Sequence, residues 1–283
     1  MYTPILSIII PCYNEQEYIR DAVTAILHAF EEKNIEILVV DDGSKDSSYE
    51  EICILQKNDS RVKAMRHERN KGKGAAIRTG VMAAMGSVIG FIDGDGEVDP
   101  QYLVEATSII SESEYVDIVI GNRYMIPNGY KTTAVRRLYS NVYRLMNWVL
   151  FALPWKDTQA GLKVFRSSVA KVLFGTSEIQ GYAFDIDILA HAHLRKLRVE
   201  ELPIMQSLKG SSTITKRHIL QMIVDTVETY RRFMPEECRL SMKRHPALFV
   251  LCIVRQLLAL PTALAAWLCA KSGLLVLSKM HRQ

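Results

Sequence analysis

The sequence predicts an α/β protein whose mostly parallel sheet is flanked by helices, and two observations lead to that prediction. Short apolar segments alternate with segments of helical spacing through residues 5–120, which is typical of strands joined by crossover helices. Such strands form a mostly parallel sheet that is covered on both faces. A polar cluster also follows four of the apolar segments, and these sheets bind ligands beyond the carboxyl ends of their strands.

The expected strands are short and continuously apolar, because a central parallel strand is buried on both faces. Pro11 ends the first of them, and the five expected strands are residues 5–10, 35–40, 62–65, 88–92 and 116–120. In the first expected helix, Ile19, Val23 and Phe30 share one face. The expected helices are residues 17–30, 47–55, 70–85 and 101–110.

The composition is that of a globular protein, with 48% hydrophobic and 23% charged residues in a chain of 283. A net charge of only +4 gives no nucleic-acid-binding signature. The five cysteines form no CxxC pair, so a reduced, cytosol-facing protein is the simplest interpretation. The first residues lack a basic segment before the apolar one, so no signal peptide is expected.

The acidic stretch after the fourth expected strand is the main candidate site. Asp93, Asp95 and Glu97 alternate with glycines, so an extended backbone would point all three carboxylates the same way. Oxygen ligands at a strand end suit Mg²⁺ or Mn²⁺ holding a diphosphate. An acidic turn that caps the next helix would account for Asp99 and Pro100, but it does not account for Asp93 and Asp95.

The other polar clusters are weak signals singly and gain weight from their common position at strand ends. The Asp41-Asp42-Gly43-Ser44 run alone would be a turn, and Gly72-Lys73-Gly74 resembles a phosphate cradle at a helix start. The P-loop pattern is absent, and the first turn has no GxGxxG, which argues against a dinucleotide enzyme. Together the clusters predict a nucleotide or phosphate site.

These motifs resemble the inverting glycosyltransferase family 2, which has the GT-A fold. The residues that carry the resemblance are 7–15 (SIIIPCYNE), 39–44 (VVDDGS), 70–74 (NKGKG) and 93–95 (DGD). Further motifs look like the branch that glycosylates polyprenyl phosphates: 121–123 (GNR), 136–137 (RR), 157–165 (DTQAGLKVF) and 183–189 (AFDIDIL). The match covers roughly residues 5–235 and is closest to the dolichyl-phosphate glucose synthases.

The resemblance implies a role for each matching residue. The donor's base and ribose would contact Pro11, Tyr13, Glu15 and Asp42, with Lys73 and Gln159 also on the donor side. Asp93, Asp95 and Glu97 would hold the metal and the diphosphate. Arg123, Arg136 and Ser140 would meet the acceptor's phosphate, and the spacing of the last two independently predicts one helical face.

Three further carboxylates belong to the implied site. Asp157 is the best candidate for positioning the donor sugar or the acceptor. Asp185 or Asp187 would line the donor-sugar pocket, and a helix N-cap is the alternative for Asp185. Arg137 is expected on a solvated helix face.

The implied reaction is metal-dependent, inverting transfer of a hexose from a nucleoside-diphosphate sugar to a polyprenyl or dolichyl phosphate, with glucose from UDP-glucose favoured. A metal and cationic groups would stabilise the departing diphosphate. The acceptor phosphate is already anionic, so it needs orientation by arginines more than a base. The open alternatives are mannose transfer from GDP-mannose, a glycan acceptor, a sugar nucleotidyltransferase and a non-catalytic scaffold.

The expected organisation is a GT-A domain of residues 1–235 and a tail of residues 236–283. Residues 246–278 are mostly apolar, but Arg255 makes a simple bilayer span costly. An interfacial or re-entrant hairpin, a tilted span that buries Arg255 in a homo-oligomer, and a helix packed on the domain all remain open. Association with the cytoplasmic face of a membrane is favoured, because a basic cluster precedes the tail.

Overall fold

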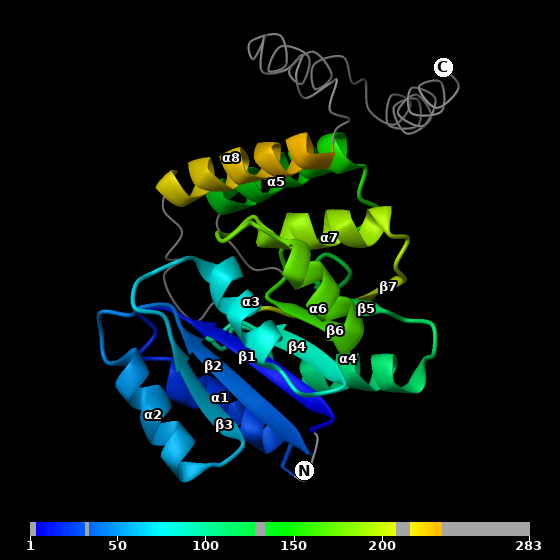
Figure 1. Cartoon of the computed structure of the whole chain (residues 1–283). Helices are drawn as coiled ribbons and strands as arrows, with labels where there is room; N and C mark the ends of the chain where they lie inside the picture. Colours follow the sequence, from blue (N-terminus) through cyan, green and yellow to red (C-terminus); the bar gives the residue numbers. More distant parts are fainter. Residues whose placement is uncertain (1–3, 32–33, 128–133, 208–215, 234–283) are drawn as a thin grey trace.

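The computed structural model describes residues 4–31, 34–127, 134–207 and 216–233. Seven strands in these ranges form one sheet in the order β3-β2-β1-β4-β6-β5-β7 (Figure 1). They are β1 (Leu6–Cys12), β2 (Ile35–Asp41), β3 (Val62–Arg66), β4 (Val88–Ile92), β5 (Ile118–Asn122), β6 (Leu162–Arg166) and β7 (Val199–Pro203). Only β6 is antiparallel to its neighbours, β4 and β5, so the predicted mostly parallel sheet is confirmed.

Eight helices are described, and they cover both faces of the sheet. They are α1 (Ile19–Ala29), α2 (Ser48–Asn58), α3 (Lys73–Ala83), α4 (Gln101–Glu112), α5 (Ala134–Phe151), α6 (Ser167–Thr176), α7 (Phe184–Leu194) and α8 (Lys216–Phe233). One core packs α1, α2 and α4 against the sheet, and the other packs α3, α6 and α7 on the opposite face. Figure 1 shows α5 and α8 side by side in an outer layer next to α7.

Alternation along β1 explains how one strand serves both cores. Ile8 and Ile10 point into the first core, and Ile9 points into the second. All seven residues of β1 are buried. This is the burial expected of a central parallel strand, and it matches the continuous apolar run in the sequence.

The predicted boundaries agree closely with the first half of the structure. The fourth expected strand is β4 without change, whereas β5 begins and ends two residues later than expected. The helix expected from residue 70 begins at Lys73. The elements after residue 122 were not assigned from sequence periodicity, and they include the reversed strand β6.

No helix within the described ranges combines the length and apolar character needed to cross a membrane. The predicted apolar tail, residues 246–278, lies outside the described residues, and so does the segment that follows the expected domain boundary at 235/236.

Candidate functional site

The predicted polar clusters converge at one edge of the sheet. The strands β1, β2 and β4 end there at Cys12, Asp41 and Ile92, respectively. The reversed strand β6 instead starts at this edge, where the Asp93 N–H donates to the Gly161 carbonyl at 3.1 Å. The segment Asp157–Gly161 therefore lies beside the acidic stretch.

Three carboxyl groups and one ammonium group lie together at this edge, and we call them the donor-side cluster after their predicted role. They belong to Glu15, Asp93, Asp95 and Lys73. Lys73 is the first residue of α3, and its Nζ lies 2.6 Å from the Asp93 Oδ1. Beside it, the Oε2 atom of Glu15 is buried without a hydrogen-bond partner. A Cβ at position 94 would clash with that oxygen, so Gly94 provides the space that the Glu15 carboxyl occupies.

The crowding of these carboxyl groups shifts their acidity. Burial, followed by the charges of Asp95 and Asp93, raises the pKa of Glu15 to about 8. Burial and then Asp93 raise the pKa of Asp95 to about 6. Burial of Lys73 opposes its charged form, but Asp93 and Asp185 outweigh that effect and raise the pKa of Lys73. The cluster therefore carries excess negative charge that a cation would neutralise.

The backbone after β4 is not extended, and the prediction that three alternating carboxylates share one direction on such a backbone is wrong. Gly94–Gly96 form a turn in which Gly96 has φ +65°, and the Asp95 Oδ1 accepts the Glu97 N–H at 2.9 Å. Beyond it, the Glu97 carboxylate accepts a hydrogen bond from Gln206. In the described part of the chain, no three acidic, histidine or cysteine side chains form a ready-made metal site.

Asp42 orders the loop that presents Lys73. Its carboxylate accepts the N–H groups of Lys71 at 2.9 Å and Gly72 at 2.7 Å, and it lies 2.6 Å from the His67 Nδ1. His67 was not identified from the sequence, and its Nε2 lies 2.9 Å from the Thr79 hydroxyl. Direct contact between Asp42 and the sugar-nucleotide donor stays a prediction. The same holds for Pro11, which is buried in β1, and for Tyr13, which is exposed.

Two of the residues predicted to meet the acceptor, Arg123 and Ser140, line a small polar pocket next to the acidic cluster. Arg123 donates to both carboxylate oxygens of Asp157, from Nε at 2.7 Å and from Nη2 at 2.8 Å. Burial opposes ionisation of Asp157, but the Arg123 hydrogen bonds and charge hold its pKa below the ordinary value. The pocket is lined by Arg123, Tyr124, Ser140, Tyr143, Arg144, Lys156, Asp157, Thr158 and Gln159.

The structure thus brings four predicted residues together in one pocket: Arg123, Ser140, Asp157 and Gln159. Arg136 lies on α5 one turn before Ser140, as the spacing predicted, but its side chain is not among those described. The pocket also contains two cations that the sequence did not single out, Arg144 and Lys156.

Asp185 is buried beneath the site and is paired with a lysine. The N-cap of α7 is Ala183, so the helix-cap alternative for Asp185 is wrong. The Asp185 Oδ1 instead accepts a hydrogen bond from the Lys163 Nζ at 2.6 Å. Lys163 was not identified as a functional residue. Its signal in the sequence is a lysine inside the apolar strand, where a buried charge requires a partner.

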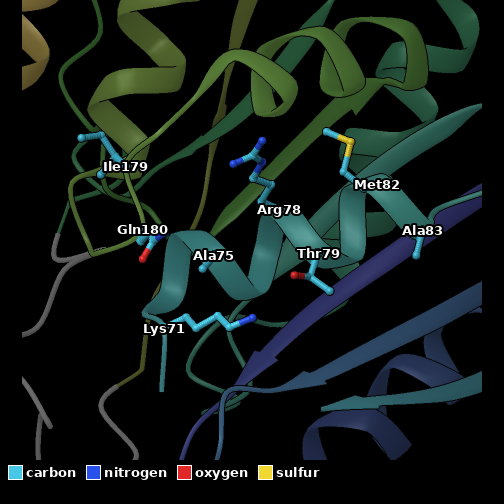
Figure 2. A pocket seen from close by; sticks show the side chains of 8 residues that line it. All are labelled: Lys71, Ala75, Arg78, Thr79, Met82, Ala83, Ile179 and Gln180. Atoms are coloured by element: carbon cyan, nitrogen blue, oxygen red, sulfur yellow. The ribbon is translucent and has the colours of Figure 1, made fainter. Parts of the chain in front are cut away.

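A larger surface pocket of about 540 Å³ runs along α3 and contains none of the predicted site residues. Figure 2 shows Lys71, Ala75 and Gln180 at the N-terminal end of α3, with Met82 and Ala83 towards its other end. The pocket borders the hydrogen-bond network around Asp42, because the Thr79 hydroxyl and the backbone N–H of Lys71 belong to that network.

Comparison with known proteins agrees with this geometry. A family model described as "Glycosyl transferase family 2" matches residues 7–174. The dolichyl-phosphate beta-glucosyltransferase of Saccharomyces cerevisiae is 29% identical over 244 residues, which cover 78% of this chain and 73% of that protein. The human dolichyl-phosphate beta-glucosyltransferase is 26% identical over 259 residues, covering 84% and 79%, respectively.

Solved structures show a related fold. Glucosyl-3-phosphoglycerate synthase from Mycobacterium tuberculosis, in complex with Mn²⁺, UDP and glucosyl-3-phosphoglycerate, superimposes with a TM-score of 0.61. That match covers 80% of each chain at 16% identity. A complex of the same enzyme with Mg²⁺ and UDP has a TM-score of 0.60, with 80% of this chain and 78% of that chain covered at 16% identity. The likeness identifies a GT-A-like fold.

Proposed function

Because the chain belongs to glycosyl transferase family 2 and is a glycosyltransferase, we propose that it transfers glucose from UDP-glucose to a dolichyl or other polyprenyl phosphate. One observation carries the proposal. An acidic cluster suited to a metal and diphosphate adjoins a cationic pocket suited to a phosphate, and Asp157–Gly161 connects the two. The sugar would be transferred at this junction.

The residues of the donor side fit a hard divalent cation, Mg²⁺ or Mn²⁺. The unpartnered Glu15 Oε2 and the crowded carboxylates of Asp93 and Asp95 are oxygen donors with excess negative charge. Asp93 and Asp95 would hold the cation, which when bound supplies electrostatic stabilisation of the departing diphosphate. Lys73 would contribute a second positive charge to the diphosphate oxygens.

The acceptor side fits a phosphate monoester. Among its described lining residues, the pocket has three cations, Arg123, Arg144 and Lys156, and one carboxylate, Asp157, so this lining has an excess of positive charge. A phosphate monoester carries about −1.5 to −2 charges at pH 7, which complements that excess. Its oxygen would attack the anomeric carbon while the bond to the diphosphate breaks, inverting that carbon, and an ionised phosphate needs no general base.

The outer layer of α5 and α8 fits a lipid acceptor. Each helix has exposed apolar residues at helical spacing: Tyr139, Val142 and Leu145 on α5, and Leu220, Ile223 and Val224 on α8. Ser140 and Tyr143, on the same helix α5, line the acceptor pocket. We propose that this apolar surface rests on the cytoplasmic face of a membrane and receives a polyprenyl phosphate from the bilayer.

A radiolabel transfer assay tests the proposal. Full-length protein, Mn²⁺ or Mg²⁺, and a polyprenyl phosphate are incubated with labelled UDP-glucose or, separately, labelled GDP-mannose, with EDTA as the control. Lipid-soluble label from UDP-glucose alone is the expected result. Label from GDP-mannose alone would overturn UDP-glucose as the donor and keep polyprenyl phosphate as the acceptor. Absence of lipid-soluble label from both donors would overturn polyprenyl phosphate as the acceptor class.

A further inference from the structure

Lys163 is a fully buried lysine that the proposed chemistry does not use. It is the second residue of β6, with 0% of its surface exposed. Its ammonium donates to the Asp185 Oδ1 at 2.6 Å and to the Ala160 carbonyl at 3.0 Å. The same nitrogen lies 5.3 Å from the centroid of the Phe91 ring. One charged group therefore contacts three segments of the chain.

Each of these three segments carries part of the site. Ala160 belongs to the segment that begins with Asp157 and ends at Gly161, whose carbonyl accepts the Asp93 N–H. Asp185 opens α7 and interacts electrostatically with Lys73. Phe91 pairs with Lys163 in the β4–β6 register, two residues before Asp93. The lysine thus connects the acceptor side, the donor side and the acidic stretch.

Stability alone does not explain the pair of Lys163 and Asp185. A buried ion pair loses hydration on both partners, and apolar residues of similar volume are often equally or more stable in its place. The remaining residues of β6 up to Phe165 are apolar and buried, and the Lys163 ammonium lies near the Phe91 ring. A charged residue there is better explained by the fixed directions of its hydrogen bonds.

We propose that Lys163 is a positioning residue that fixes the segment Asp157–Gly161 relative to α7 and β4. It holds the donor and acceptor halves of the site in register and contacts neither substrate. The catalytic part of this inference rests on the proposed function. Its structural part, the immobilisation of Asp157–Gly161, is independent of any substrate.

Hydrogen exchange of the substrate-free, full-length protein tests the structural part. In Lys163→Met, amide exchange of residues 157–161 and of Asp93 should accelerate at least tenfold, while α1 and α2 keep their rates. The matched control is Lys63→Met, which breaks another ion pair, half-exposed Lys63 with buried Glu36 at 2.6 Å, away from this edge. The control should leave residues 157–161 unchanged.

Transfer kinetics test the catalytic part. Lys163→Met should lower kcat about a hundredfold, the loss expected from a misplacement of about 1 Å, while KM for UDP-glucose changes less than threefold. Should Lys163→Met fail to fold, Asp185→Asn removes the negative charge of the partner at nearly constant volume and should accelerate the same amides. Unchanged exchange of residues 157–161 in a folded variant, or acceleration spread evenly over the whole protein, would overturn the inference. A wild-type protein that makes no lipid-linked glucose would overturn only the proposed function.

Discussion

The Lys73 ammonium lies 2.6 Å from the Asp93 carboxylate, so the site contains its own cation before any metal binds. A divalent cation that binds the Oδ1 atom of Asp93 must share this oxygen with Lys73 or displace the ammonium. The donor's diphosphate then offers Lys73 a new anionic partner. Donor and metal binding are therefore expected to support each other.

Lys73→Met should separate the effect of Lys73 on donor binding from its effect on metal binding. The donor loses a cationic contact, so kcat/KM for UDP-glucose should fall about a hundredfold, or ~2.7 kcal/mol. Asp93 loses its counter-ion, so Mn²⁺ should bind the donor-free protein about tenfold more tightly. Calorimetric titration with Mn²⁺ measures the second effect, with exposed Lys57→Met as the control. Weaker Mn²⁺ binding in Lys73→Met would contradict this account.

Asp95→Ala should abolish transfer and leave the fold intact. Asp95 is one of three crowded carboxylates, and their mutual repulsion is part of the reason that its pKa is raised to about 6. Removal of one should therefore leave the melting temperature of the metal-free protein unchanged or higher. Differential scanning calorimetry and the radiolabel assay give the two readings. Near-normal turnover in this variant would show that Asp95 is not a ligand of a catalytic metal.

The metal-free protein should lose stability as the pH rises. The pKa of Glu15 is about 8 in the folded protein against an ordinary value of 4.5. The folded state therefore holds this proton more tightly than the unfolded state does. The resulting stabilisation is complete below pH 4.5 and is lost as the pH rises through 8.

Glu15→Gln should flatten that part of the pH dependence. The comparison is the slope of the free energy of unfolding between pH 5 and 8 in EDTA, measured with urea for the wild type and the variant. Glu17→Gln, at a neighbouring exposed position, is the control and should keep the wild-type slope. Equal slopes in wild type and Glu15→Gln would show that Glu15 ionises normally.

Arg136→Ala should weaken use of the lipid phosphate more than donor binding. Loss of one charged hydrogen bond to a phosphate costs roughly 1.5–3 kcal/mol, which corresponds to a rise of about 10- to 150-fold in KM for the acceptor. The neighbouring Arg137 is exposed on α5, and Arg137→Ala is the matched control. Similar acceptor kinetics in the two variants would assign Arg136 to the solvated face of the helix.

Negative charges introduced on the exposed apolar surface of α5 and α8 should prevent this surface from resting on the bilayer. The double variant Val142→Glu with Val224→Glu changes two exposed residues, so the fold should be retained. Transfer to long-chain polyprenyl phosphate in anionic vesicles should fall at least tenfold. Transfer to a short-chain, water-soluble polyprenyl phosphate should change less than twofold. Equal losses with both acceptors would show that this surface acts on the site and not on the membrane.

The sequence predicted the sheet and the convergence of the polar clusters at one edge, because both depend on local patterns. Apolar runs identified the strands from β1 to β5, and the polar residues that follow them converge as expected. The direction of a strand leaves no mark on its own apolar pattern, so the antiparallel β6 was not foreseen. The turn at Gly94–Gly96 redirected Glu97 towards Gln206, a partner 109 positions away in the sequence.

Two residues of the site were missed for the same physical reason. His67 and Lys163 act on Asp42 and Asp185, respectively, which are distant in the sequence. Spacing rules detect partners that share a helix or a strand, as with Arg136 and Ser140 on α5. Contacts between elements require the tertiary structure.

Among the described strands, β6 is the one that runs against its neighbours, and it gives the candidate site two kinds of connection. At the shared edge, the acidic cluster follows the ends of β1 and β4, whereas Asp157–Gly161 precedes the start of β6. A change of length before β6 would therefore alter the segment that joins the acidic cluster to the cationic pocket without interrupting any crossover between β1, β2 and β4. Under the proposed function, such a change would modify part of the acceptor side and leave the donor side in place.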